Sequence, residues 1–105
     1  MNEEIYALTN KDLVRELGAR FKEYRLHYNK SQRAVAEHTG LSIFTVNNFE
    51  NGKGSGISLV NLLKLLRTVE ALEDIQKVLP PLPASPMLLY KLQGKKRKRA
   101  SKIEK

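Results

Sequence analysis

The sequence predicts an all-α fold, a compact bundle of about five helices followed by a short C-terminal helix and a basic tail. Three observations support this prediction. Apolar residues recur at three- and four-residue spacing in several stretches, as expected for helices with one buried face. Serine or threonine precedes most of these stretches, and glycine or proline follows them. No stretch of convincing length alternates between apolar and polar residues in the manner of a β-strand.

The first helix is expected from about Lys11 to His27, with Thr9 as its cap. Gly18 lies inside this stretch and costs about 1 kcal/mol relative to alanine, which predicts that a neighbouring helix approaches closely there. One face of the helix is apolar and is expected to face the core. Its residues are Val14, Leu17, Phe21, Tyr24 and Tyr28.

Residues 31–53 contain two short helical patterns separated by one glycine. Ser31 can cap the first pattern, and Gly40 can end it because glycine adopts a positive φ at no steric cost. Ser42 can cap the second pattern, which runs from Ile43 to about Glu50. The two patterns together predict a helix-turn-helix.

The spacing of small and branched residues around Gly40 agrees with this prediction. Ala36 lies four residues before Gly40, where two crossing helices need a small side chain. Val46 lies six residues after it and points back into the same contact. We therefore expect the two helices to cross at a steep angle and to touch at these positions.

These residues resemble the lambda-repressor-like, or Xre-type, DNA-binding domains over roughly Leu13 to Leu79. The resemblance implies that the second helix of the motif contacts bases. It also implies an internal ion pair that joins the first helix to the end of that recognition helix, so both partners are excluded from the DNA-binding set. The matching residues are Arg25, Gln32, Ala36, Gly40, Ser42, Val46, Glu50, Asn51 and Gly52, with Arg25 and Glu50 as the pair.

The recognition helix is expected to have a core side and a DNA side. At 100° per residue, Val46 and Phe49 lie on one side and Phe44 lies on the other. Phe44 could pack on thymine methyl groups while Asn48 pairs with adenine, or its ring could instead contact a neighbouring helix. The resemblance implies base contacts at three of these positions, and the helical wheel adds Asn47. The predicted base-reading residues are Ile43, Phe44, Asn47 and Asn48.

A second set of residues is expected to contact phosphates. Gln32 opens the first helix of the motif, where free backbone N–H groups can approach an anion. The resemblance implies backbone contacts at most of the other positions, whereas Lys30 and Arg33 are considered from position alone. Serines can instead serve only as caps, and surface cations are often only solvated. The predicted phosphate-binding residues are Gln32, Arg33, Ser42, Thr45, Asn51 and Lys53.

Two more helices are expected after the motif. Ser58 can cap the first of them, and Pro80 and Pro81 end the second. The expected core residues are Leu59, Leu62, Leu63, Leu66 and Val69 in the first, and Ile75, Val78 and Leu79 in the second.

The sequence divides into residues 1–79, a helix-turn-helix domain; residues 80–86, a proline-rich linker; and residues 87–105, a short amphipathic helix with a basic tail expected to be disordered. The helix is too short to be stable alone, so its apolar residues need a surface on the body, a second copy or another protein. These residues are Met87, Leu88, Leu89 and Leu92.

The net charge of +8 is concentrated in the tail, because residues 91–105 hold eight Lys or Arg and only one acidic residue. A basic arm on a nearly neutral body predicts binding to DNA phosphates, with a solvated tail as the alternative. The tail also resembles the extension of HipB-like antitoxins, which accompany HipA-type kinase toxins. The predicted tail contacts are Lys95, Lys96, Arg97, Lys98 and Arg99.

Composition limits the other function classes. The chain has no cysteine and only two isolated histidines, so we expect no metal site and no cofactor. It shows no secretion signal or membrane-spanning run, which predicts a cytoplasmic location. No nucleophile and base occur in a pattern that predicts an enzyme.

The sequence therefore predicts a homodimeric transcriptional repressor that binds double-stranded DNA at a palindromic operator and autoregulates a toxin-antitoxin operon. The alternative is an antitoxin whose main partner is a HipA-type kinase toxin. The neighbouring genes would discriminate between the two.

Overall fold

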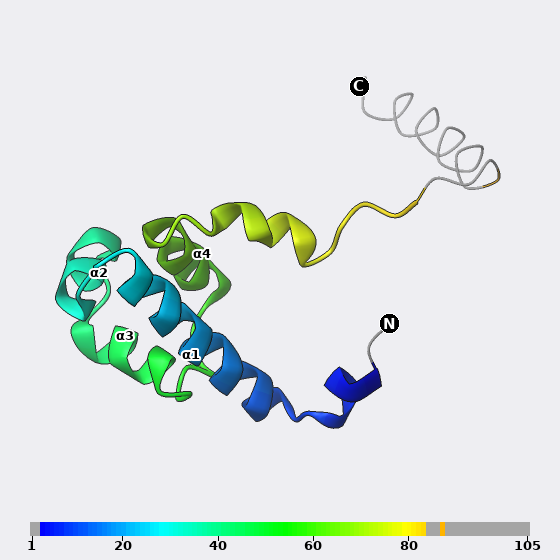
Figure 1. The fold of residues 1–105 in the computed structure, drawn as a ribbon, viewed down its shortest axis with the longest axis horizontal. Helices are drawn as coiled ribbons and strands as arrows, with labels where there is room; N and C mark the ends of the chain where they lie inside the picture. The colour runs from blue at the N-terminus through cyan, green and yellow to red at the C-terminus, as the bar shows by residue number, and fades with distance from the viewer. Residues whose placement is uncertain (1–2, 84–86, 88–105) are drawn as a thin grey trace, which may run out of the picture.

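A computed structural model describes residues 3–83 and 87, and these residues form a helical bundle without strands (Figure 1). The predicted all-α fold is confirmed. Four elements are α-helices and two are 3₁₀ helices. In chain order they are η1 (Glu3–Ala7), α1 (Asn10–His27), α2 (Gln32–Thr39), α3 (Ile43–Glu50), α4 (Leu59–Thr68) and η2 (Leu72–Lys77).

Hydroxyl side chains set the start of all four α-helices. Thr9 and Asp12 form a capping box, in which the Thr9 hydroxyl accepts from the Asp12 N–H at 3.0 Å and the Asp12 carboxylate accepts from the Thr9 N–H at 3.1 Å. Ser31, Ser42 and Ser58 each accept from the backbone N–H three residues on. The four predicted caps are therefore confirmed.

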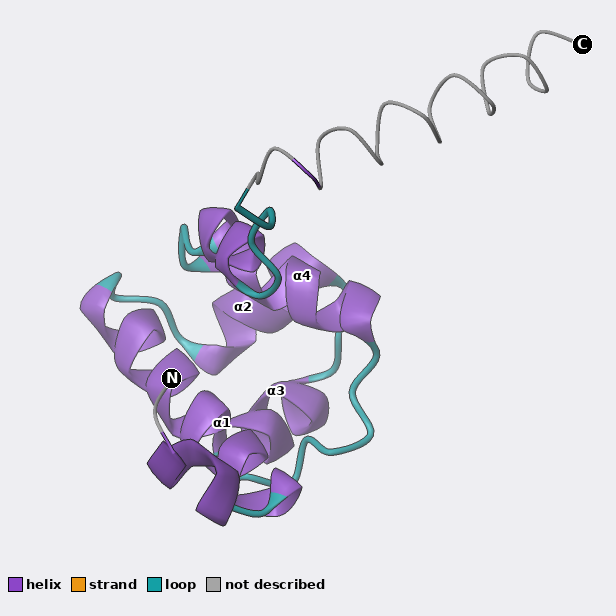
Figure 2. Ribbon diagram, turned by 90° about the vertical axis from the view of Figure 1, so that its right-hand side faces the viewer, coloured by secondary structure: helices purple, strands orange, loops and turns teal. Residues whose placement is uncertain are grey.

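The helix-turn-helix forms as expected. Gly40 ends α2 in the left-handed conformation, with φ of 78°. Ala36 and Val46 are both buried at the crossing of α2 and α3. α3 also packs along α1, while α2 packs on α4, and α4 packs on η2. Figure 2 shows α1 and α3 side by side.

The core lies where these helices meet. Phe21 of α1 and Phe49 of α3 pack edge to face, with ring centroids 5.5 Å apart. Aliphatic side chains from α2, α3 and α4 complete the cluster. The buried members of the core are Phe21, Val35, Ala36, Val46, Phe49, Leu65, Val69 and Ala71.

Gly18 allows α1 to approach α3 closely, as predicted. A Cβ atom at this position would lie 1.9 Å from the carbonyl oxygen of Phe49. Because the obstructing atom belongs to the backbone, no side-chain rearrangement could relieve the clash. Gly18 therefore fixes how near α1 and α3 can lie.

The prediction for the core face of α1 is mostly wrong. Phe21 is buried and Val14 is half-buried, but Leu17, Tyr24 and Tyr28 are 43%, 39% and 38% exposed. The spacing of the apolar residues showed which of them share a face of α1, but the bundle is too small to cover that whole face. α3 covers α1 on one side only, so the apolar residues facing η2 stay open to solvent.

The C-terminal part of the domain also differs from expectation. Leu59 is 66% exposed in the first turn of α4, whereas Leu65, which was not predicted, is fully buried. The buried residues of α4 come from its second half, where it meets the core. The expected fifth helix is a 3₁₀ helix that ends at Lys77, so Val78 and Leu79 are exposed instead of packed.

The predicted C-terminal helix lies outside the described residues except for Met87, which is 70% exposed. The tail cations at positions 95–99 also lie outside them. The proposed division at residues 79 and 86 stays a prediction.

Candidate DNA-binding surface

α3 presents one buried face and one open face. Val46 and Phe49 are buried, whereas Phe44 is 74% exposed in the first turn of the same helix. A ring this exposed does not pack on a neighbouring helix, so that alternative for Phe44 is not realised. Ile43 and Asn47 are also exposed, and Asn48 is half-buried at the edge of the open face. The structure therefore brings the four predicted base-reading residues to one side of α3.

A shallow hollow of about 300 Å³ borders this open face. Phe44, Thr45 and Asn48 line it from α3, and Asn61 lines it from α4. Lys53 lines it from the loop, where its backbone N–H donates to the Asn48 carbonyl oxygen at 2.8 Å. The hollow thus joins an aromatic ring, an amide and a cation on one accessible surface.

A buried ion pair holds α3 against α1, as the family resemblance implies. Arg25 Nε donates to Glu50 Oε2 at 2.6 Å, and Arg25 Nη2 donates to Glu50 Oε1 at 2.9 Å. Arg25 Nη1 also donates to the Lys30 carbonyl oxygen at 2.8 Å. The two residues are only 6% and 5% exposed, so neither can contact DNA without breaking this pair.

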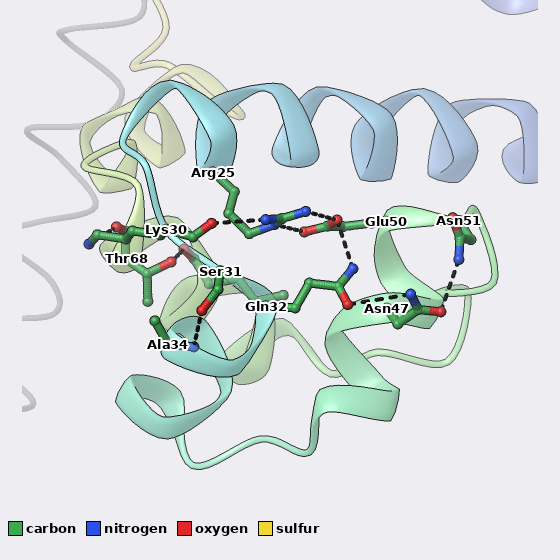
Figure 3. A network of polar contacts seen from close by, with 10 residues as sticks. Arg25, Lys30, Ser31, Gln32, Ala34, Asn47, Glu50, Asn51 and Thr68 are labelled. Atoms are coloured by element: carbon green, nitrogen blue, oxygen red, sulfur yellow. Dashed lines mark hydrogen bonds and ion pairs between the residues drawn. The ribbon is translucent and has the colours of Figure 1, made fainter.

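A chain of amides extends from the ion pair toward the open face (Figure 3). Gln32 Nε2 donates to Glu50 Oε1 at 3.1 Å, and Gln32 Oε1 accepts from Asn47 Nδ2 at 3.4 Å. Asn47 Oδ1 in turn accepts from Asn51 Nδ2 at 2.9 Å. Three of the predicted DNA-binding residues are therefore joined in one network. Sequence reasoning missed this arrangement, because no local spacing relates Gln32 to Glu50.

The N-termini of α2 and α3 lie near this surface. Ser42 caps α3, and its hydroxyl lies 2.9 Å from the Thr45 hydroxyl, so both side chains have local partners. Arg33 and Lys53 are exposed. Lys30 is engaged elsewhere, because its ammonium donates to the Thr68 carbonyl oxygen at the end of α4. Lys30 therefore has a structural role, in contrast to the two exposed cations.

Comparison with known proteins supports the same interpretation. A family described as helix-turn-helix domain matches residues 18–74, which is more than half of the chain. No curated protein matches the sequence. No helix among the described residues is long and apolar enough to cross a membrane. The chain therefore belongs to the helix-turn-helix domain family and is a DNA-binding protein of the lambda-repressor, or Xre, kind.

Proposed function

We propose that this protein is a sequence-specific transcriptional repressor that reads bases with the open face of α3. The observation that carries the proposal is the 74% exposure of Phe44 on a helix whose opposite face is buried. In the major groove an aromatic side chain can pack on thymine methyl groups, and the neighbouring Asn48 can form a bidentate pair with adenine.

Phosphate contacts would set the position of α3 in the groove. The backbone N–H groups at the N-termini of α2 and α3 offer donors to anions. Arg33 in the first turn of α2 and Lys53 in the loop after α3 add exposed cations. Ser42, Thr45 and Asn51 are proposed to contact the DNA backbone from the two ends of α3. Gln32 is proposed to contact the DNA backbone and also to align Asn47 through their hydrogen bond.

The repressor is proposed to act as a homodimer on a palindromic operator. One short helix presents only a few side chains to the bases, which is too few for useful discrimination. A two-fold pair would place two α3 helices about 34 Å apart, in successive major grooves on one face of the duplex. Occupation of a promoter by such a dimer would repress transcription, and we propose that the repressed operon is the protein's own toxin-antitoxin operon.

A second candidate function is that of an antitoxin that binds a HipA-type kinase toxin. The exposed Met87 and the resemblance of the C-terminal segment favour it. An adjacent reading frame for a kinase would support this role, and neighbouring phage or restriction genes would favour a simple repressor.

Selection of DNA from a random duplex pool tests the main proposal. We expect the purified full chain to enrich an inverted repeat with half-site centres one helical turn apart. The double variant Phe44→Ala, Asn48→Ala should bind DNA but enrich no common sequence. An absence of enrichment by the wild-type chain would contradict sequence-specific binding, and enrichment of a single half-site would contradict the dimer.

A further inference from the structure

An apolar groove of about 240 Å³ lies between α1 and η2, on the part of the molecule that the DNA-binding proposal does not use. Leu17 and Tyr24 of α1 line one wall, and Ile75 of η2 lines the other. Phe49 and Leu66 lie among its lining residues and connect it with the core. In Figure 1, α3 lies below α1 while η2 lies above it, so α3 and η2 lie on opposite sides of α1.

An open apolar surface of this kind needs an occupant, because exposure of Leu17 and Tyr24 to water is unfavourable. The chain itself carries a matching segment. Residues 87–92 read MLLYKL, with four aliphatic side chains and one lysine. Asp74 lines the groove, and although it already pairs with Lys77 at 3.2 Å, its carboxylate is exposed and would complement that lysine as well.

The path of the chain argues against docking into its own groove. Val78 lines the groove, so the chain leaves the body at the groove's edge. Leu79 and Leu82, immediately beyond, are 88% and 80% exposed, and Met87 is 70% exposed. Four prolines occur between residues 79 and 86. A proline-rich sequence of this kind favours a stiff, extended chain, which disfavours the sharp reversal that docking into the adjacent groove would need.

From these observations we infer that residues 87–92 of a second copy of the chain occupy the groove between α1 and η2. The exchange is reciprocal, so each copy gives one segment and receives one, and two grooves are filled instead of one. Reciprocal exchange docks two six-residue segments, so it buries twice the surface that one docked segment would bury. This inference rests on the proposed function, because it takes the proposed homodimer as given.

Two full-length variants test the groove and the segment independently. Leu17→Glu places a charge in the groove wall, and Leu89→Asp places one in the segment. Leu26→Glu is the matched control, because Leu26 is also an exposed leucine of α1 but does not line the groove. Circular dichroism melts of all the chains establish that they are folded before their assembly is measured.

The variants are sedimented first alone and then as a mixture, and each measurement has an expected result. Wild type and Leu26→Glu should sediment as dimers, whereas Leu17→Glu and Leu89→Asp alone should each sediment as monomers, with a dissociation constant raised at least about a hundredfold. Mixing Leu17→Glu with Leu89→Asp should restore a dimer, because the intact segment of the first fits the intact groove of the second. That mixed dimer contains one filled groove and should be weaker than the wild type.

Three outcomes would overturn the inference. A monomeric wild type would leave the groove to another protein, and a dimeric Leu89→Asp with a monomeric Leu17→Glu would mean that groove packs on groove. Two monomeric variants that fail to complement each other would likewise exclude exchange. Binding of the same monomeric variants to the selected operator distinguishes these failures from failure of the proposed function, because a monomer with an intact α3 should bind a half-site weakly but still in preference to unrelated DNA.

Discussion

Leu17 and Gly18 are neighbours in α1, yet they face two very different surroundings. Gly18 meets the backbone of α3 so closely that a Cβ atom would lie 1.9 Å from the Phe49 oxygen. Leu17 borders an open groove and is 43% exposed. The α1–α3 side is thus closed by backbone contact and a buried ion pair, whereas the α1–η2 side is left unfilled. Close backbone packing and the buried ion pair therefore hold α3 against α1, while the opposite side of α1 borders an open apolar groove.

The largest effect is expected from breaking the ion pair on the closed side. Glu50→Ala would leave Arg25 nearly buried without its carboxylate, which should lower the free energy of unfolding by about 3–5 kcal/mol. Urea denaturation measures this loss. Glu37→Ala, at an exposed position of α2, is the control and should change stability by less than about 0.5 kcal/mol. Equal losses in both variants would mean that the buried pair does not secure α3.

The next largest effect is expected from Gly18→Ala. The added methyl group meets a backbone carbonyl that cannot turn away, so the helices must separate at a cost of about 3 kcal/mol. Gly56→Ala provides the matched control, because a Cβ atom there meets no atom within 4 Å. If thermal melts showed the two variants to be equally stable, the close approach of α1 and α3 would not constrain the fold.

A smaller effect is expected on the open side. Leu17→Ala removes a side chain that is only partly buried, so we expect a loss of about 1 kcal/mol in the isolated monomer. Denaturation at protein concentrations below the dimer dissociation constant measures it. A loss as large as that of Gly18→Ala would show that the groove is part of the packed core.

The smallest effect concerns the start of α1, outside both contacts. The hydrogen bond from the Thr9 backbone N–H to the Asp12 carboxylate, followed by the contribution of the Thr9 side chain, lowers the pKa of Asp12 below its ordinary value of 3.8. The folded state therefore binds this proton less readily, so the carboxylate contributes stability above pH 3.8 and loses that contribution as the pH falls below it. The melting temperatures of wild type and Asp12→Ala should differ at neutral pH and converge in acid. A constant difference would exclude the capping box as its cause.

The closed side was more predictable from the sequence than the open side. Ser31, Ser42 and Gly40 are local signals, and each acts on the helix end beside which it stands. Gly18 was informative because glycine inside a helix is unfavourable unless a neighbour needs the space. The sequence could not show how much of an apolar face its neighbours cover. Leu59 of α4, expected in the core, is therefore 66% exposed, whereas Leu65, which was not among the expected core residues, is buried.

The candidate site was also predicted only in part. The helical wheel placed Phe44 on the open face of α3, where it lies 74% exposed. The amide chain from Glu50 through Gln32 to Asn47 was missed, because it depends on how two helices cross and not on spacing within either one. The functions of these side chains stay predictions until binding is measured.

Binding to a panel of single-base operator variants tests most directly whether the open face of α3 reads bases. Wild type and Phe44→Ala are compared on each variant, with Tyr6→Ala as the control, since Tyr6 is 71% exposed on η1, outside α3. We predict that Phe44→Ala abolishes discrimination at particular positions, at a cost of about 1–3 kcal/mol on the intact operator, while Tyr6→Ala changes nothing. Equal weakening on every variant, or no weakening at all, would contradict base reading by this face.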